Sequence, residues 1–192
     1  MPGLFYALLY AAIAAGALST AAMAGETPRQ QEVAQRGADV MPFSLAATTH
    51  IFTKTAHGGI QQVITKHPDA RQTTLIRQHL ASIAKQFAQG NFSDPTRIHG
   101  MSMPGLATLR AARPGELRVS YRDVPNGGEI DYSSKQPRLV GALHQWFDAQ
   151  LSDHGHDAMA GAADMRDMHG MHDMTGMAAV NAHTPVQSGK SD

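Results

Sequence analysis

The sequence predicts an α+β fold made of two ββα units, which together form a four-stranded antiparallel sheet with helices on one face. Two observations lead to this prediction. Each half of the chain contains two strand-like segments joined by a turn with a Gly-Gly pair, and each hairpin is followed by a segment with one apolar stripe at helical spacing. The four strand-like segments are residues 49–54, 60–65, 117–122 and 129–132.

The second hairpin shows its strand pattern most clearly. Leu117, Val119 and Tyr121 alternate with polar residues, which is typical of a strand with one buried face. Asn126 precedes its Gly-Gly pair, and His57 holds the same turn position in the first hairpin. Turn propensity therefore explains His57.

Two long helices are expected after the hairpins. The first extends from an N-cap at Asp69 to a stop at Gly90, and the second covers residues 137–152. A third, short helix is expected at residues 105–110. The two stripes consist of Ile76, His79, Leu80, Ile83 and Phe87, and of Val140, Leu143, His144, Phe147 and Leu151.

The N-terminus has the pattern of an export signal. An uncharged apolar run at residues 4–18 is followed by Ala22-Met23-Ala24, a cleavage site of small residues. We predict a signal peptide at residues 1–24 and a periplasmic or other exported location. An uncleaved membrane anchor remains the alternative, whereas cleavage leaves no stable membrane span.

The rest of the chain divides by composition. Residues 25–41 are polar and are interpreted as a linker, and residues 42–156 as the α+β domain. Residues 157–192 are rich in Gly, Met and His and poor in large aliphatic side chains, so this segment (the tail) is predicted to be disordered.

Composition excludes several classes of function. The chain has 192 residues, no Cys, 16 basic and 16 acidic residues, and 11 Met and 11 His. Without Cys there is no disulfide framework, thiolate metal site or Cys nucleophile. The zero net charge argues against nucleic acid as a partner. No nucleophile or phosphate-binding motif is present, which favours a function other than catalysis.

The tail carries the strongest functional signal. Five methionines recur at every third position, and two histidines lie among them. Thioethers are soft ligands that suit Cu(I) and, by the same logic, Ag(I), while imidazole also suits Cu(II). A packing stripe is the alternative, but a period of three drifts around a helix and the intervening residues are polar. The predicted ligands are Met165, Met168, His169, Met171, His172, Met174 and Met177.

Two shorter groups repeat the same residue types upstream. His99, Met101 and Met103 fall within five residues, where a loop lets ligands converge. His154 and His156 follow at the end of the last helix, and Met159 forms a His-x-x-Met pair with His156 just before the tail repeat. We predict all six as metal ligands; for the first group the alternative is a surface loop with an incidental His.

His79 and His144 occupy comparable places on the two helical stripes. Each could be an ordinary buried, hydrogen-bonded histidine. If the helices lie side by side, both imidazoles face one interior, and Asp148 could orient His144. We therefore include both as candidate ligands. His50 lies in a strand and is left undecided, and Trp146 is expected to pack at the boundary of sheet and helix.

Four stretches of the sequence resemble a group of small exported bacterial proteins, some of which are labelled aspartate carbamoyltransferase. The stretches are Thr48-Thr49-His50-Ile51-Phe52, His57-Gly58-Gly59, the motif from Ile98 to Leu106, and the motif from Leu143 to Gly155. The Ser-Thr-Arg-Thr carbamoyl-phosphate loop of that enzyme class is absent here, and the resemblance implies no activity. The tail is similar to Met/His-rich periplasmic proteins that bind copper or silver.

The sequence thus predicts an exported metal-binding protein, a Cu(I)/Ag(I) buffer or chaperone in copper tolerance. Its expected partners are metal ions and copper efflux or oxidase proteins of the envelope. One alternative is an envelope interaction module that binds no metal and has a flexible tail. Another is a small enzyme that uses His79, His99 and His144 as acid–base groups.

Overall fold

The computed structural model describes residues 25–162. Its core is a five-stranded mixed sheet with the strand order β3-β4-β2-β1-β5. Neighbouring strands are antiparallel except for β5, which runs parallel to β1. The strands are β1 (Thr48–Thr55), β2 (Gly58–Thr65), β3 (Arg118–Val124), β4 (Gly127–Ser133) and β5 (Ala158–Ala160).

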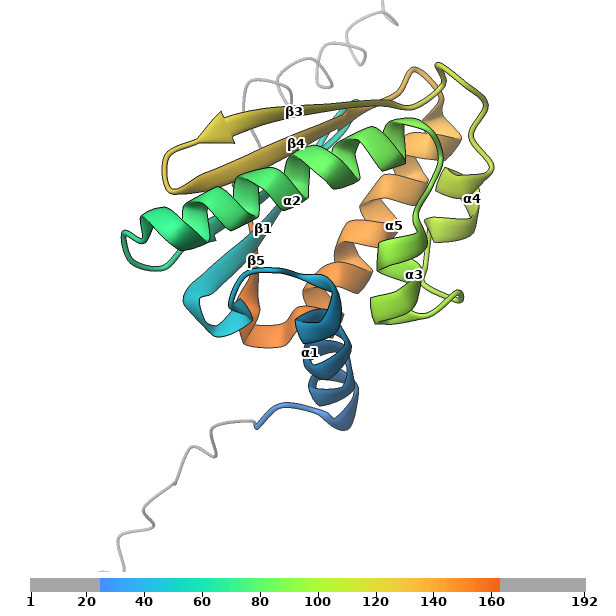
Figure 1. Ribbon diagram of the computed structural model, residues 1–192. Helices are drawn as coiled ribbons and strands as arrows, with labels where there is room; N and C mark the ends of the chain where they lie inside the picture. The colour runs from blue at the N-terminus through green and yellow to red at the C-terminus, as the bar shows by residue number, and fades with distance from the viewer. Residues whose placement is uncertain (1–24, 163–192) are drawn as a thin grey trace, which may run out of the picture.

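The helices account for most of the remaining chain. The two long ones, α2 and α5, lie across the sheet in Figure 1. The five α-helices are α1 (Pro28–Val40), α2 (Ala70–Ala88), α3 (Ser93–His99), α4 (Leu106–Arg110) and α5 (Pro137–His154). Two single turns, Leu45–Ala47 and Gly155–Asp157, precede β1 and β5.

The predicted four-stranded antiparallel sheet is wrong, although the α+β class holds. Strand β5 adds a parallel edge to β1, with His50 opposite Ala158 and Ile51 opposite Met159. Both predicted hairpins are present and pair side by side, because β2 is hydrogen-bonded to β4. The expected short helix is present as α4, whereas α3 is an additional helix.

The segment interpreted as a linker is helical. Thr27 caps α1 by accepting a hydrogen bond from the Gln30 backbone N–H, while the Gln30 side chain accepts one from the Thr27 backbone N–H. This capping box and a proline at the first turn stabilise the helix start. Val33 is fully buried, so α1 packs against the domain.

Both long helices cover the same face of the sheet. Phe52 of β1 contacts Phe147 of α5, and Tyr132 of β4 contacts both Phe87 of α2 and Trp146 of α5. The alternation in β1 buries Thr48, His50 and Phe52 under the helices. This places a histidine among the core side chains.

Candidate functional site

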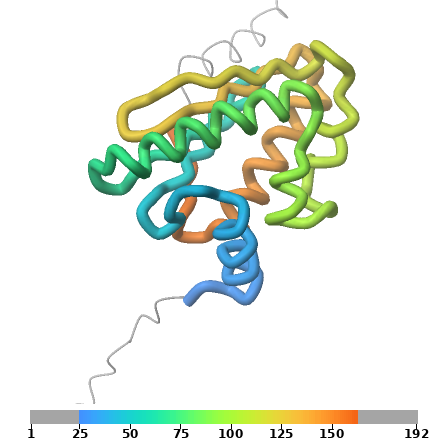
Figure 2. Tube along the Cα trace, in the orientation of Figure 1, coloured from blue at the N-terminus to red at the C-terminus, as the bar shows by residue number. Residues whose placement is uncertain are grey.

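Three buried histidines from three separate elements meet at one end of the domain. They are His50 in β1, His99 at the end of α3 and His154 at the end of α5, with exposed fractions of 3%, 4% and 8%. Figure 2 shows α1, α3 and the end of α5 lying together there. We call these three residues the imidazole cluster.

Local backbone geometry explains why two of these histidines lie at helix ends. Gly100 has a φ of 87° and Gly155 a φ of 54°, and each follows directly on the last residue of its helix. Glycine adopts such left-handed values readily and commonly ends helices. Each helix therefore stops immediately after its histidine.

The rings of the imidazole cluster are in direct contact. The ring centres of His50 and His154 are 4.8 Å apart and their planes differ by 9°. The ring of His154 meets that of His99 at 5.0 Å, nearly edge-on. His154 thus lies between the other two.

A carboxylate orients one member of the cluster. The Nδ1 atom of His99 lies 2.8 Å from Oδ2 of Asp153. Arg29 of α1 donates to both oxygens of Asp153, at 2.7 and 3.0 Å, and to the His99 backbone carbonyl at 2.7 Å. Because an ionised Asp153 accepts, His99 carries its proton on Nδ1 and keeps a free lone pair on Nε2.

Burial keeps the cluster uncharged. It lowers the pKa of His50 to about 4, against partial opposition from Asp157. Burial also lowers the pKa of His99, against the effect of its hydrogen bond to Asp153. The pKa of His154 is lowered first by burial and then by the charges of His50 and His99. Neutral imidazoles are the form that binds metals.

The charge states of His99 and Asp153 also depend on burial and on their hydrogen bonds. Burial acts to raise the pKa of Asp153, but hydrogen bonds from Arg29 and His99 outweigh it, and the pKa is lowered. Since the pKa of His99 is lowered as well, a neutral imidazole donates to a carboxylate here. The ion pair of Asp153 is with Arg29.

A small cavity of about 40 Å³ adjoins the cluster and includes all three of its histidines in the lining. Two buried polar atoms of this lining have no hydrogen-bond partner within residues 25–162, Nδ1 of His50 and Nε1 of Trp146. A buried polar atom left without a partner costs about 1–3 kcal/mol. The cavity therefore favours a polar occupant.

The structure separates the two histidines of the helical stripes. His79 is half-buried, lines the same cavity and contacts Phe43 at a ring distance of 5.7 Å. His144 donates from Nε2 to the carbonyls of Thr55 and Gly58, at 3.0 and 2.9 Å, and so holds the β1–β2 turn. His144 does not line the cavity.

The upstream methionines and His156 have different surroundings. Met103 is buried in the core, whereas Met101 and Met159 are 72% and 53% exposed. His156 is exposed, with its Nδ1 3.4 Å from a carboxylate oxygen of Glu26. Of the two predicted groups, only His99 and His154 come together in the cavity.

Several predicted features lie outside the described residues. These are the signal peptide at residues 1–24 and most of the tail. The ligands concerned are Met165, Met168, His169, Met171, His172, Met174 and Met177. The start of the tail is described, and residues 158–160 of this predicted disordered segment form strand β5.

Sequence reasoning left one member of the cluster undecided and missed its supporting residues. His50 shares the inward face of β1 with Phe52, and that alternation is visible in the sequence. Arg29 and Asp153 are 124 residues apart, and no local pattern indicates that they pair.

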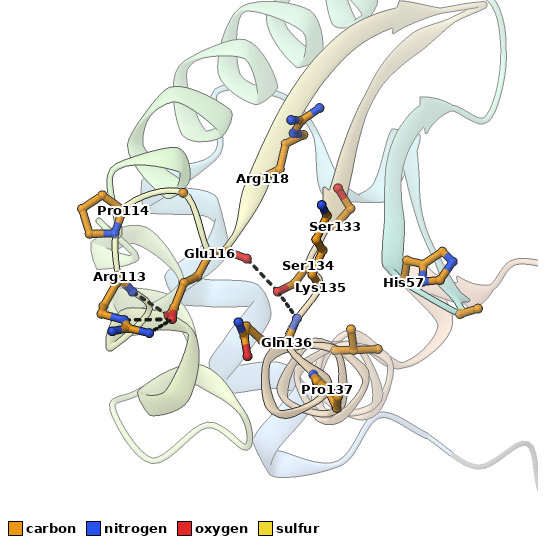
Figure 3. Close-up of a pocket in the computed structure, with 13 residues that line it drawn as sticks. His57, Arg113, Pro114, Glu116, Arg118, Ser133, Ser134, Lys135, Gln136 and Pro137 are labelled. Carbon is orange, nitrogen blue, oxygen red and sulfur yellow. Dashed lines mark hydrogen bonds and ion pairs between the residues drawn. The ribbon is translucent and has the colours of Figure 1, made fainter.

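A second pocket lies on the surface at the N-terminal end of α5 (Figure 3). Arg113 and Arg138 pair there with Glu116, whose pKa is lowered to about 2 chiefly by the Arg113 backbone N–H and side chain. Arg118 and Lys135 line it as exposed cations. Among the described residues, every buried side-chain polar atom of this lining has a hydrogen-bond partner, whereas Nδ1 of His50 in the cluster has none.

Within residues 25–162, no group of three or more His, Asp or Glu side chains is already arranged to hold a metal ion. No helix of this part of the chain is long and apolar enough to cross a membrane. Comparison of the chain with protein-family models, curated proteins and solved structures gives no match.

The buried state of His50 predicts an acid-sensitive fold. In metal-free protein, His50 is expected to remove about 3 kcal/mol from the free energy of unfolding as pH falls from 7 to 4. Its pKa is 6.5 in the unfolded chain and about 4 in the fold. The unfolded chain therefore binds the proton first, so the stability is complete above pH 6.5 and is lost towards pH 4.

Urea unfolding at several pH values, in the presence of a chelator, measures this loss. The variant His50→Gln is expected to flatten the pH dependence of the free energy of unfolding. An equally steep pH dependence in the variant and in the original chain would contradict the assignment to His50.

Proposed function

We propose that the protein is an exported metal-binding protein that buffers Cu(I) and Ag(I) or hands them over in copper tolerance. One observation carries this proposal. A segment with methionine at every third position, from Met165 to Met177, follows directly on a domain that ends at a cluster of neutral imidazoles. Thioether and imidazole together are the ligand types that copper prefers in a chain without Cys.

The position of the tail supports the proposal. Strand β5 pairs with β1 so that Ala158 lies opposite His50, and the next residue, Met159, presents an exposed thioether. The tail therefore begins beside the imidazole cluster. Metal bound by weak tail sites is held close to the domain, which raises its local concentration there.

The chemistry that we propose is binding and transfer without turnover. Neutral thioethers bind soft ions without a change in charge, and several weak sites exchange ions quickly with a recipient. The recipients that fit are copper efflux or oxidase proteins of the envelope. The apolar run and cleavage pattern at residues 1–24 support the exported location.

Removal of residues 163–192 tests this function in cells. This deletion keeps β5 and the described fold, and it removes all seven predicted ligands from Met165 to Met177. We expect copper sensitivity to rise to that of a strain without the protein. The amount of protein in the exported fraction serves as the control. Unchanged tolerance at equal protein level would contradict the proposal and favour an interaction module that binds no metal.

A further inference from the structure

We propose that His50, His99 and His154 form an internal site for one transition-metal ion that prefers nitrogen ligands. This inference deepens the proposed function, on which it rests for the role of the imidazole cluster, and assigns that cluster a metal site of its own that needs none of the thioethers of the tail. The donors of this site come from β1, α3 and α5, so the site exists only in the folded domain.

The spacing of two of the three ring pairs suits one shared ion. Two imidazoles that bind one ion at 2.0–2.1 Å have ring centres about 5 Å apart. The observed separations are 4.8 Å for His50 and His154, and 5.0 Å for His99 and His154. These two pairs are already at the right separation, and His154 belongs to both. A shared ion therefore also requires the rings of His50 and His99 to turn towards each other.

His99 is already held in the form that a metal needs. Its Nδ1–H donates to Asp153, which Arg29 fixes from the other side with two hydrogen bonds. Metal-binding histidines commonly donate their second nitrogen to a carboxylate in this way, which sets the tautomer and strengthens the ligand. Asp153 is thus the positioning residue of the site.

On the side that faces the cavity, the cluster offers both space and a nitrogen atom without a hydrogen-bond partner. Nδ1 of His50 is buried without a partner, and the adjoining cavity of about 40 Å³ has room for a single ion or water. The planes of His50 and His154 now differ by only 9°, which matches the finding that no set of three groups converges yet. Binding would turn these rings towards the cavity and give the His50 nitrogen a partner.

Residue-resolved nitrogen spectra of the full-length chain test the site. Zn²⁺ is a suitable probe because it binds imidazole and has a filled d shell that leaves the spectra undisturbed. One equivalent added to metal-free, ¹⁵N-histidine-labelled protein is expected to shift the ring nitrogens of His50, His99 and His154. Shifts confined to the tail histidines His169 and His172, or to histidines that are exposed in the described domain, would overturn the proposal, as would no shift at all.

The variant Asp153→Asn tests the positioning role. We expect it to weaken Zn²⁺ binding by roughly 10–100-fold, as losses of such supporting carboxylates do. Asp148→Asn is the matched control. Asp148 lies on the same helix, and its side chain is 62% exposed and pairs with Lys54. The ring of His144, which Asp148 is predicted from the sequence to orient, bonds instead to the carbonyls of Thr55 and Gly58. Asp153→Glu should restore part of the affinity. Equal affinity in Asp153→Asn and Asp148→Asn would overturn the role of Asp153.

The outcomes also separate this site from the proposed function. If the chain fails to compete for Cu(I) but Zn²⁺ shifts the ring nitrogens of the cluster, the proposed function is contradicted and the internal site is supported. A chain that binds Cu(I) through the tail and shows no shift in the cluster gives the opposite result.

Discussion

Replacing Met165, Met168, Met171, Met174 and Met177 with leucine is expected to weaken Cu(I) binding by roughly tenfold or more. Leucine keeps nearly the size and apolarity of methionine but has no sulfur. The change therefore removes soft ligands and little else. Titration of purified protein against a competing Cu(I) chelator measures the effect.

The control for this variant changes the same segment without touching sulfur. Asp167→Asn and Asp173→Asn remove two carboxylates from between the methionines. Carboxylates are hard ligands that contribute little to Cu(I) binding, so the double variant should bind as the original chain does. A five-leucine variant that competes as well as the control would show that the methionine repeat is not the Cu(I) site.

Trp146→Ala is expected to lower the free energy of unfolding by about 3–5 kcal/mol, as is usual for a buried aromatic residue. Trp146 is 1% exposed and its ring contacts those of Phe87, Phe92 and Tyr132 at 5.9, 5.9 and 5.7 Å. Its loss leaves a cavity where both long helices meet the sheet. Chemical denaturation at neutral pH measures the change.

Trp146→Phe separates packing from the indole N–H. This N–H has no partner among the described residues, so its removal leaves no acceptor without a donor. Phenylalanine keeps much of the apolar contact, and the loss of stability should be well below that of Trp146→Ala. Equal losses in the two variants would contradict the packing explanation.

Periodicity predicts the two hairpins and the two long helices, and it misses α1, α3 and β5. The hairpins and long helices carry clear alternation or apolar stripes. Strand β5 consists of Ala158, Met159 and Ala160, which have no strand preference, and it forms because the end of α5 delivers the chain beside β1. Helix α1 has one buried apolar side chain, Val33, so its stripe was too weak to distinguish it from a linker.

The candidate site shows the same limit at the level of side chains. His99 and His154 stand out as ligands because each lies in a short motif with other donors. Their contact with His50 depends on the pairing of β1, α3 and α5, which no local spacing encodes. From their positions on the apolar stripes, His144 and His79 are predicted to share one site. In the structure His144 donates instead to the turn carbonyls of Thr55 and Gly58.

The central claim is that the chain binds Cu(I), and one titration tests it directly. Full-length, metal-free protein is titrated with Cu(I) in the presence of a coloured competing chelator. We predict that the protein withdraws several equivalents of Cu(I) from the chelator, fewer when residues 163–192 are removed. A full-length chain that withdraws none at any concentration would contradict the claim.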